Sequence, residues 1–377
     1  MCISERRSLS EELRKNGLTY DHLIYRHNPP YLTDGTPYEP WDREEPIAQG
    51  IPAVSFFSGG GGLDLGFSMA GFKVLAAFER DVNACLTLRT NFKDLVVVGP
   101  PDADGDLRNR DETISVLKSL GIGAPFEGVF LGGPPCQPFS IASNQRFSKD
   151  GPNFKRIGFS HAEYGSLLDD FIFYINIFQP RAFLIENVPG MSDGKEYFCA
   201  LGNLEVAGYN FKELMVNASN YGVPQERRRL LIVGWRTDSL FRGIKEELGV
   251  RHVLSVLQQP LAGIANHVTR EHEAESVLRY MELQYGQRDK LGRVDRLHPG
   301  LPSKTIISGG SKGGGRSHLH PTIPRTLSPR ECARIQTFPD TYVFQGAVAR
   351  QFTQIGNAVP PRLAFVVARS ILNSLFL

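Results

Sequence analysis

Ala53-Val54-Ser55-Phe56-Phe57-Ser58-Gly59-Gly60-Gly61-Gly62-Leu63 is the stretch that decides the fold class of this chain. Its apolar first half predicts a buried strand, its four glycines predict a loop, and the run from Leu63 to Ala70 predicts a helix. A strand, a glycine loop and a helix in this order begin a nucleotide-binding α/β unit, because glycines let a ligand approach the backbone and leave the helix N-terminus open to an anion. Such loops occur in many Rossmann-like proteins, so this stretch by itself indicates a fold class and no activity.

Two acidic residues follow at positions typical of a nucleoside pocket. The predicted second strand, Lys73 to Phe78, ends at Glu79, where a carboxylate can accept hydrogen bonds from ribose hydroxyls. Asp106, in Gly105-Asp106-Leu107, is a candidate acceptor for an adenine amino group. Either acid alone is more often a surface residue, but their order and spacing together predict a pocket for an adenosine-containing cofactor.

A cysteine stands on a stiff loop in Leu131-Gly132-Gly133-Pro134-Pro135-Cys136-Gln137-Pro138-Phe139-Ser140. The apolar run from Gly128 to Leu131 predicts a buried strand, which breaks on two glycines and two prolines. A thiol held at the C-terminal end of a strand is where an open α/β sheet places a nucleophile. A lone cysteine is more often a small buried hydrophobe, but a core cysteine does not need flanking prolines and glycines.

Two further stretches place charged residues at strand ends. Arg181 to Ile185 predicts a strand that leads into Glu186-Asn187-Val188, which makes Glu186 a second catalytic candidate. Predicted strands at 211–216 and 230–235 bracket Gln225-Glu226-Arg227-Arg228-Arg229. Three consecutive arginines are by default a solvated surface, but their place directly before a buried strand favours a role in a site.

These stretches resemble, in order, the motifs of the cytosine-C5 DNA methyltransferases that use S-adenosylmethionine (AdoMet). The matching motifs lie between about residue 53 and residue 366. They cover Phe57 to Phe67, Glu79 to Phe92, Pro134 to Ser140, Glu186 to Val188, Gln225 to Arg229, Thr326 to Pro339 and Gln354 to Pro361. The resemblance implies an α/β fold, a Rossmann-like AdoMet-dependent methyltransferase sheet with a second, smaller target-recognition domain. It also implies AdoMet as the cofactor, S-adenosylhomocysteine as its product, and no metal.

Site residues follow from the resemblance position by position. The implied catalytic residues are Cys136, Glu186, Arg227 and Arg229. The implied cofactor-binding residues are Phe57, Ser58, Gly59, Gly61, Gly62, Leu63, Glu79, Arg80, Asp106, Leu107, Pro135, Asn357 and Ala358.

The implied chemistry explains why these residue types are needed. A thiolate at Cys136 adds to C6 of cytosine and makes C5 nucleophilic enough to take a methyl group. Glu186 stabilises the ring at N3 and reads the N4 amino group, and Arg229 holds O2 with Arg227 in support. The target base has to be flipped out of the duplex at a cost of a few kcal/mol. The sequence identifies no base for the final removal of the C5 proton.

Four segments are expected along the 377 residues: an N-terminal extension at 1–50, an AdoMet-binding catalytic domain at 51–235, a target-recognition region at 236–320, and a C-terminal part at 321–377 that returns to the catalytic domain. Residues 236–330 hold 15 Lys/Arg and 9 Asp/Glu, although the whole chain has a net charge of only +2. This asymmetry favours a DNA-binding face there over a plain solvated surface. The polar stretch 140–159 is a candidate mobile loop with phosphate contacts.

Smaller elements are predicted at the two ends of the chain. Ser8 to Glu11 fits a capping box that begins a short helix, and Ser328 with Pro329 begins another. Asn28 to Trp41 is expected to be an extended segment that either lies on the main domain or contacts DNA. The final helix, Arg362 to Leu377, is expected beside the first strand.

Composition excludes several classes of protein. The five cysteines lack a CxxC pair, which argues against a disulfide framework and a zinc site. No apolar run approaches the ~20 residues of a membrane span, and the N-terminus lacks a signal-peptide core. These absences predict a cytoplasmic protein that binds no membrane. The resemblance implies a bacterial enzyme that acts on double-stranded DNA, and we expect it to be a monomer. Two alternatives stay open: a tRNA cytosine-C5 methyltransferase, although the Cys-Phe-Thr signature of that branch is missing, and a non-catalytic DNA-binding paralogue, although Cys136 and Glu186 are both present.

Overall fold

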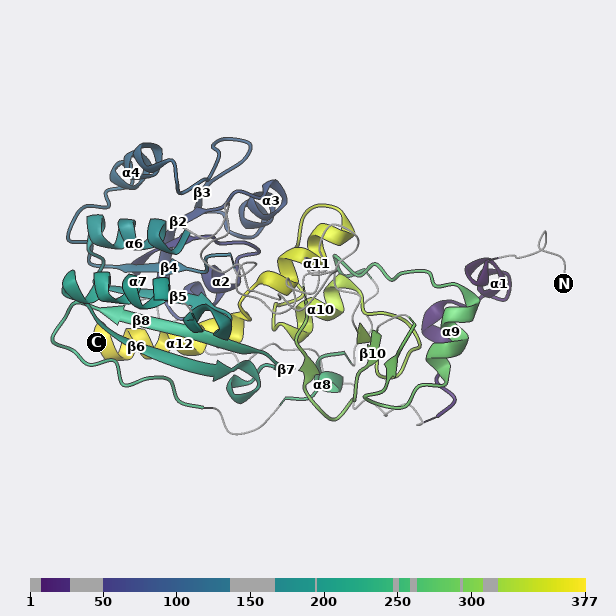
Figure 1. The fold of residues 1–377 in the computed structure, drawn as a ribbon. Helices are drawn as coiled ribbons and strands as arrows, with labels where there is room; N and C mark the ends of the chain where they lie inside the picture. Colours follow the sequence, from purple (N-terminus) through teal and green to yellow (C-terminus); the bar gives the residue numbers. More distant parts are fainter. Residues whose placement is uncertain are drawn as a thin grey trace. The chain divides into compact units, whose positions relative to one another are not determined.

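The structure is a computed structural model that describes residues 8–27, 50–135, 167–193, 195–246, 251–257, 263–291, 294–307 and 318–377. The chain divides into two compact units, which Figure 1 draws as ribbons. Unit 1 comprises Met1–Asp42, Gly222–Glu226 and Leu248–Ala358, and unit 2 comprises Arg43–Tyr221, Arg227–Glu247 and Val359–Leu377. The four-segment division expected from the sequence stays a prediction, and these units divide the chain at other points.

Unit 2 is built on a seven-stranded sheet in the order β3-β2-β1-β4-β5-β8-β6. The strands are β1 (Ile51–Phe56), β2 (Phe72–Phe78), β3 (Val96–Val98), β4 (Val129–Gly132), β5 (Ala182–Asn187), β6 (Asn210–Asn217) and β8 (Arg228–Trp235). Neighbouring strands are parallel except at β8, which runs antiparallel to both β5 and β6. This mostly parallel sheet confirms the predicted Rossmann-like α/β fold.

Helices cover both faces of this sheet (Figure 1). They are α2 (Gly62–Met69), α3 (Val82–Asn91), α4 (Arg110–Ser119), α6 (Leu167–Phe178), α7 (Lys195–Val206) and α12 (Pro361–Leu375), with short 3-10 turns η4 (Pro189–Asp193) and η5 (Ala218–Tyr221). Right-handed crossovers put α2 and α3 on one face and α4, α6 and α7 on the other. The final helix, α12, was expected beside the first strand. It packs on α2, the helix that follows that strand, where a side chain at Gly66 would overlap Ala364.

The core of unit 2 explains why these strands form. The strands β4 and β5 are buried along their whole length, as expected for parallel strands covered on both faces. Phe56 at the end of β1 packs against the rings of Phe78, Phe130 and Phe171, with centroids 5.0–5.2 Å apart. This aromatic cluster supports the end of β1 where the glycine loop begins.

Unit 1 has less regular structure in its described part. Its helices are α1 (Leu9–Lys15), α8 (Val253–Leu257), α9 (Ala274–Met281), α10 (Pro329–Ile335) and α11 (Val348–Asn357), with the 3-10 turn η2 (Tyr20–His22). Its strands are β7 (Gln225–Glu226), β9 (Arg288–Asp289), β10 (Val294–Arg296), β11 (Ser303–Lys304) and β12 (His318–Leu319), which form a sheet in the order β12-β10-β9 and a β11-β7 pair. No strand of unit 1 among the described residues exceeds three residues, so side-chain packing has to hold this unit together.

The predicted capping box at Ser8 is present, and the helix predicted to begin at Ser328 and Pro329 also begins with a capping box. The Ser8 hydroxyl accepts from the backbone of Glu11 at the start of α1, and Ser328 does the same for Glu331 at the start of α10. Residues 28–41 and the polar stretch 140–159 lie outside the described residues, so the predictions on them stay predictions. Among the residues that the structure describes, no helix is long and apolar enough to cross a membrane.

Candidate active site

The carboxyl ends of β1, β2, β4 and β5 meet at one edge of the sheet in unit 2, and the predicted site residues of this unit follow them. Open α/β sheets bind their ligands at this edge, because loops leave the strands there in opposite directions. The glycine loop follows β1, Glu79 follows β2, and Pro134 and Pro135 follow β4. Glu186 is the second-last residue of β5.

The loop after β1 has an unusual backbone. Phe57 has a φ of 57°, and Gly59 and Gly61 have φ values of 53° and 77°. Glycine adopts this left-handed region freely, but a bulky residue such as Phe57 is strained there by roughly 1–3 kcal/mol. Strain of this kind is concentrated at ligand sites. Gly62 then begins α2, so the free backbone N–H groups at the start of this helix face the loop.

Glu79 ties the loop to the second strand. Its Oε2 accepts from the backbone N–H of Gly59 at 2.7 Å, and its Oε1 accepts from that of Asp81 at 2.7 Å. Burial raises the pKa of Glu79, and these backbone donors partly oppose that shift. The backbone of Arg80 hydrogen-bonds this carboxylate as well. A carboxylate has about four acceptor sites, so Glu79 can still accept one bond from a hydroxyl group.

Asp106 is already engaged by arginines. Both of its oxygens accept from the guanidinium of Arg108, and Arg80 lies 3.9 Å away. The hydrogen bonds from Arg108 lower the pKa of Asp106. The carbonyl of Leu107, the next residue, accepts from the hydroxyl of Tyr174. The Arg108 guanidinium is partly exposed, so Asp106 can receive an adenine amino group only if that guanidinium turns aside.

At the end of β5, two predicted catalytic residues are in direct contact. The Nε of Arg229 lies 2.8 Å from the Oε1 of Glu186, and their side chains are 11% and 10% exposed. Strand pairing explains the contact, since Glu186 of β5 is opposite Leu231 of β8 and Arg229 is two residues before it. Residues two apart in a strand share a face of the sheet. The tertiary fold thus brings together a carboxylate and a guanidinium that are 43 positions apart in the sequence.

Asn187 is a functional residue to which sequence reasoning assigned no role. Its Nδ2 donates to the carbonyl of Pro134 at 3.0 Å, and its Oδ1 accepts from the backbone of Val188. A side chain added at Gly133 would lie 3.5 Å from the Oε2 of Glu186. The tip of β5 therefore holds the start of the loop that carries Cys136. The Glu186-Asn187-Val188 motif was the sequence feature that could have pointed to Asn187.

The remaining predicted residues divide between the units. In unit 2, Arg227 is buried, and its backbone N–H donates to the side chain of Asn217. In unit 1, Asn357 ends α11 and is exposed, whereas Ala358 is buried. Contacts of these last two residues with a cofactor stay a prediction. Cys136 lies outside the described residues.

Comparison with known proteins decides the family. The family model described as C-5 cytosine-specific DNA methylase matches residues 51–373. The type II methyltransferase M.NgoFVII of Neisseria gonorrhoeae is 31% identical over 85% of this chain and 86% of its own length. M.PspPI of a Psychrobacter strain is 32% identical over 85% and 79%. A solved structure described as a prophage-encoded DNA modification methyltransferase of E. coli is 25% identical, with a TM-score of 0.67 over 86% of this chain and 99% of that one.

The chain belongs to the C-5 cytosine-specific DNA methylase family. This methylase is thus an enzyme of the DNA (cytosine-5-)-methyltransferase class, and proteins of this class use AdoMet.

The described residues of the methylase fit AdoMet, except that the Asp106 carboxylate is already bonded to Arg108. Among the described residues, a side chain added at Gly59 would come within 4 Å of the Phe57 carbonyl alone, at 3.9 Å, so this part of the loop leaves open space. Glu79 retains acceptor capacity for a ribose hydroxyl. Asp106 has to give up its contact with Arg108 before it can accept a hydrogen bond from an adenine amino group. Among the described residues, no group of His, Cys, Asp or Glu could hold a metal ion.

A buried acid of this site has no assigned role. Asp64, in the first turn of α2, is fully buried, and neither carboxylate oxygen makes a hydrogen bond of ordinary geometry within the described residues. Burial raises the pKa of Asp64 to about 7, although the hydroxyls of Ser55 and Ser58 oppose the shift. Its place directly after the glycine loop was the sequence feature that could have pointed to Asp64.

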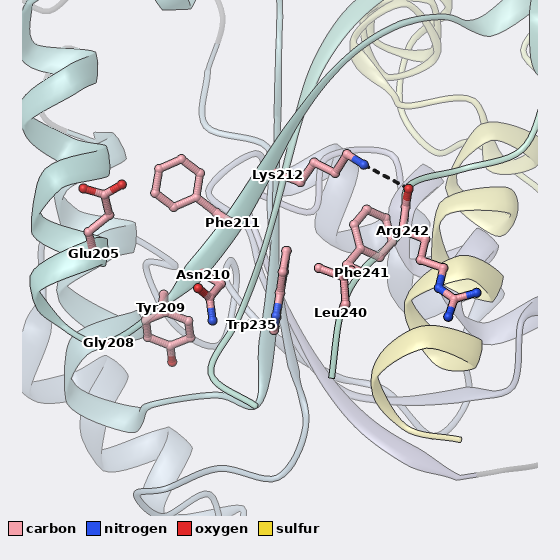
Figure 2. A pocket seen from close by; sticks show the side chains of 10 residues that line it. All are labelled: Glu205, Gly208, Tyr209, Asn210, Phe211, Lys212, Trp235, Leu240, Phe241 and Arg242. Carbon is pink, nitrogen blue, oxygen red and sulfur yellow. Dashed lines mark hydrogen bonds between the residues drawn. The ribbon is translucent and has the colours of Figure 1, made fainter. Parts of the chain in front are cut away.

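A pocket in unit 2 is remote from these residues. It has a volume of about 810 Å³ and lies between α7, β6 and β8, lined among others by Trp235 and Phe241 (Figure 2). Trp235 is opposite Ala182, the first residue of β5, so the pocket lies at the other end of the sheet from Glu186. Lys212 donates to the Arg242 carbonyl. We assign the pocket no part in the reaction.

Proposed function

We propose that this methylase transfers a methyl group from AdoMet to C5 of a flipped-out cytosine in a specific duplex DNA site, through a covalent bond between Cys136 and C6. The observation that carries the proposal is the contact of Glu186 with Arg229 beside the loop that leads to Cys136. The similarity to type II methyltransferases further suggests a role in a restriction-modification system.

The steps assign one task to each residue. The thiolate of Cys136 adds to C6, and the electron pair of the C5–C6 bond becomes available at C5. Glu186 takes up a proton and shares it with N3, where negative charge develops on the ring. Arg229 holds the Glu186 side chain and donates to O2, and the buried Arg227 supports the pocket. A base or water then removes the C5 proton, and Cys136 leaves as a thiolate.

AdoMet, when bound, supplies the electrophilic methyl group. The chain's part is to hold it at the edge of the sheet in unit 2. The proposed contacts are the loop residues Phe57, Ser58, Gly59, Gly61, Gly62 and Leu63, the residues Glu79 and Arg80 after β2, Asp106, Leu107 and Pro135, and Asn357 and Ala358 of unit 1. The helix N-terminus at Gly62 suits a carboxylate, and Glu79 suits a ribose hydroxyl.

DNA recognition is assigned to unit 1. Residues 236–330 hold 15 Lys/Arg against 9 Asp/Glu in a chain of net charge +2, and phosphate contacts from such a region offset the cost of flipping a base. The chemistry in unit 2 and the reading of sequence in unit 1 are then separate tasks, which separate experiments can distinguish.

Transfer of labelled methyl groups tests the proposal. The full-length protein is incubated with labelled AdoMet and either duplex plasmid DNA or tRNA, and bisulfite sequencing maps any modified cytosine. We expect label in DNA at one sequence and none in tRNA. Cys136→Ser abolishes transfer if the covalent step is right, and it retains binding of S-adenosylhomocysteine. Label in tRNA alone, or full turnover by Cys136→Ser, overturns the proposal.

A further inference from the structure

The N-terminal segment Ser8–His27 lies outside the part of the chain that the family model matches, and yet it is packed into unit 1. We propose that this segment is a working part of the DNA-recognition unit, which holds the recognition region in its DNA-binding conformation and has no part in binding AdoMet. The inference rests on the proposed assignment of DNA recognition to unit 1.

The first contact is apolar. Leu13 and Tyr20 of the segment form a buried cluster with Val277 of α9, and Leu9, Leu23 and Met281 pack against it. The other side of α9 packs on the small sheet, because Tyr280 clusters with Leu283, Val294 and Leu319. An isolated helix of eight residues is not stable in water, so α9 depends on partners on both of its sides. The segment supplies one of them, and Figure 1 shows α1 next to α9.

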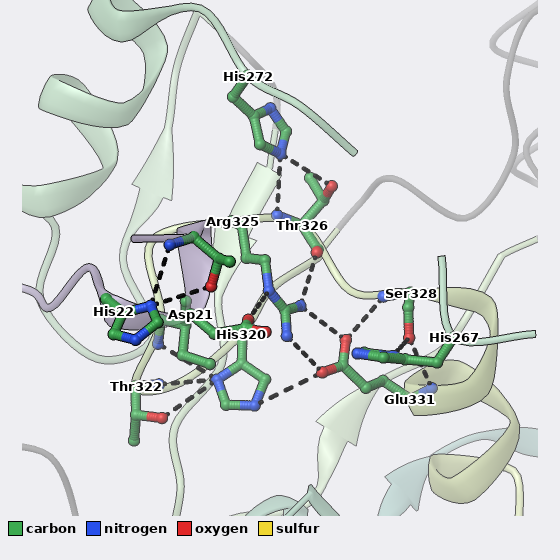
Figure 3. A network of polar contacts seen from close by, with 12 residues as sticks. Asp21, His22, His267, His272, His320, Thr322, Arg325, Thr326, Ser328 and Glu331 are labelled. Carbon is green, nitrogen blue, oxygen red and sulfur yellow. Dashed lines mark hydrogen bonds and ion pairs between the residues drawn. The ribbon is translucent and has the colours of Figure 1, made fainter. Parts of the chain in front are cut away.

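The second contact is a polar network around Arg325 (Figure 3). Arg325 is 2% exposed, and its guanidinium makes two hydrogen bonds with the Glu331 carboxylate at 2.8 and 2.9 Å. Its Nε donates to Asp21 of the segment at 2.9 Å. Burial keeps His320 beside them neutral, since it lowers the pKa of that ring to about 4. Asp21 therefore supplies a second negative charge to a buried guanidinium.

One residue before Asp21, Tyr20 joins the segment to the chain ahead of α9. Its hydroxyl donates to the carbonyl of His272 at 2.6 Å and accepts from the backbone N–H of the same residue at 2.9 Å. The His272 ring contacts Thr326 in turn. The segment thus connects two parts of the recognition unit that are 54 positions apart.

The third contact surrounds a second buried cation, Arg296 of β10. Its guanidinium lies 3.4 Å from the centre of the Tyr25 ring and 4.0 Å from that of Tyr285. It donates to the carbonyls of Pro321 and Leu283, and at 3.3 Å to that of His27. The Tyr25 hydroxyl also donates to the carbonyl of His320 at 2.9 Å. One of the two rings and one carbonyl around this cation therefore come from the segment.

All of these contacts are made with α9 and with strands and loops of the basic interval, residues 236–330. The strands of unit 1 in the described residues are two or three residues long, so they hold few backbone hydrogen bonds of their own. Without the segment, α9 would lose one packing face, and two buried arginines would lose part of their surroundings. A recognition surface that is not held in one conformation binds DNA more weakly, because ordering it is then part of binding.

The test uses the full-length chain with the double substitution Asp21→Asn and Tyr25→Ala. Binding is measured to a short duplex that carries the site mapped by bisulfite sequencing, and separately to AdoMet by titration calorimetry. We expect the Kd for the duplex to rise about tenfold or more, while the Kd for AdoMet stays within about twofold. Hydrogen exchange at the amides of Ala274–Met281 rises, and exchange in β1, β4 and β5 does not.

Glu12→Gln is the matched control, since Glu12 is on the same segment in an exposed pair with Lys15, and it leaves all three measurements unchanged. Tyr20→Phe is a milder variant that keeps the ring and removes the two bonds to His272, and a smaller loss in duplex affinity is expected. If neither the double substitution nor Tyr20→Phe changes duplex binding, the inference is overturned. It is also overturned if the affinity for AdoMet falls as much as the affinity for the duplex. A wild-type protein that binds no duplex DNA refutes the proposed function instead, and the exchange data still report whether the segment holds α9.

Discussion

Glu186 and Arg229 form an ion pair of 2.8 Å at the edge of the sheet, with both side chains close to fully buried. A buried carboxylate is unfavourable unless it is paired, and this pair leaves the second oxygen of Glu186 directed toward the Gly133 side of the site. One oxygen is therefore fixed by the arginine, and the structure gives the other no hydrogen bond within the described residues. This arrangement suits the ring-stabilising role proposed for Glu186.

Arg229→Lys is predicted to lower kcat by about 10²-fold, because an ammonium group cannot reproduce the directed donors of a guanidinium. Single-turnover methylation of plasmid DNA measures the effect. Arg228→Lys is the control, since Arg228 is the exposed neighbour in the same strand, and it should lose far less. Equal rates for the two variants would mean that the ion pair has no catalytic role.

Asn187→Ala is predicted to lower kcat more than it weakens cofactor binding. The substitution removes the donor to the buried carbonyl of Pro134, which costs about 1–3 kcal/mol of stability and frees the start of the Cys136 loop. Rates and the Kd for AdoMet are compared with those of Asn203→Ala, an exposed position on α7. A loss in Kd that matches the loss in kcat would contradict the predicted role in positioning the loop.

Gly99→Ala is predicted to weaken binding of S-adenosylhomocysteine by at least about tenfold, since small displacements in a site have large effects. The added methyl group would overlap the carbonyl of Glu79 and the sulfur of Cys85, so Glu79 would have to move. Gly123→Ala has open space around it and serves as the control in the same calorimetric titration. If both variants bind like wild type, Glu79 does not contact the ligand.

Asp64→Asn is predicted to stabilise the protein more at high pH than at low pH. The native pKa of Asp64 is raised to about 7 from an ordinary 3.8, so its contribution to stability is fully present below the unfolded value. It is lost as pH rises through the native value, because the carboxylate then has to be charged while buried. The gain from the substitution should be on the order of 3 kcal/mol larger at pH 8 than at pH 5. Urea unfolding of both proteins at the two pH values measures it, and parallel stability curves would show that Asp64 does not titrate.

Glu331→Gln is predicted to destabilise the protein by about 3–5 kcal/mol at neutral pH, because it leaves the guanidinium of Arg325 buried without its main partner. Burial raises the pKa of Glu331, but Arg325 outweighs this and lowers it to about 2. The stability that this depressed pKa provides is present above about 4.5 and is lost as pH falls toward 2. The gap between the two proteins in urea unfolding should therefore close in acid. A gap that stays constant down to pH 2 would contradict the ion-pair account.

Much of unit 2 could be predicted because its signals are local. The apolar run before the glycine loop and the one before Gly132 each became a strand within a residue or two of the expected bounds. The capping boxes of α1 and α10 formed in unit 1 for the same reason, because all of their atoms are within four residues. The signal for β5, which ends one residue after Glu186, is equally local, and only its pairing with β8 involves distant residues.

Unit 1 was predicted poorly for the opposite reason. Its elements are too short to show a period, and the contacts that hold it connect distant positions. Asp21 and Arg325 are 304 residues apart, and nothing near either residue indicates the other. The link from Asn187 to Pro134 spans 53 residues, and it depends on β4 and β5 being neighbours.

The class of sheet, the family motifs and the identity of the residues at its edge could be predicted from the chain alone, because short-range patterns of apolar, glycine and capping residues decide where strands and helices begin. Which of these residues touch is seen only in the folded molecule. The pairing of Glu186 with Arg229 and the incorporation of Ser8–His27 into unit 1 both follow from burying apolar surface and pairing buried charge between distant segments, and neither requirement leaves a local pattern in the chain.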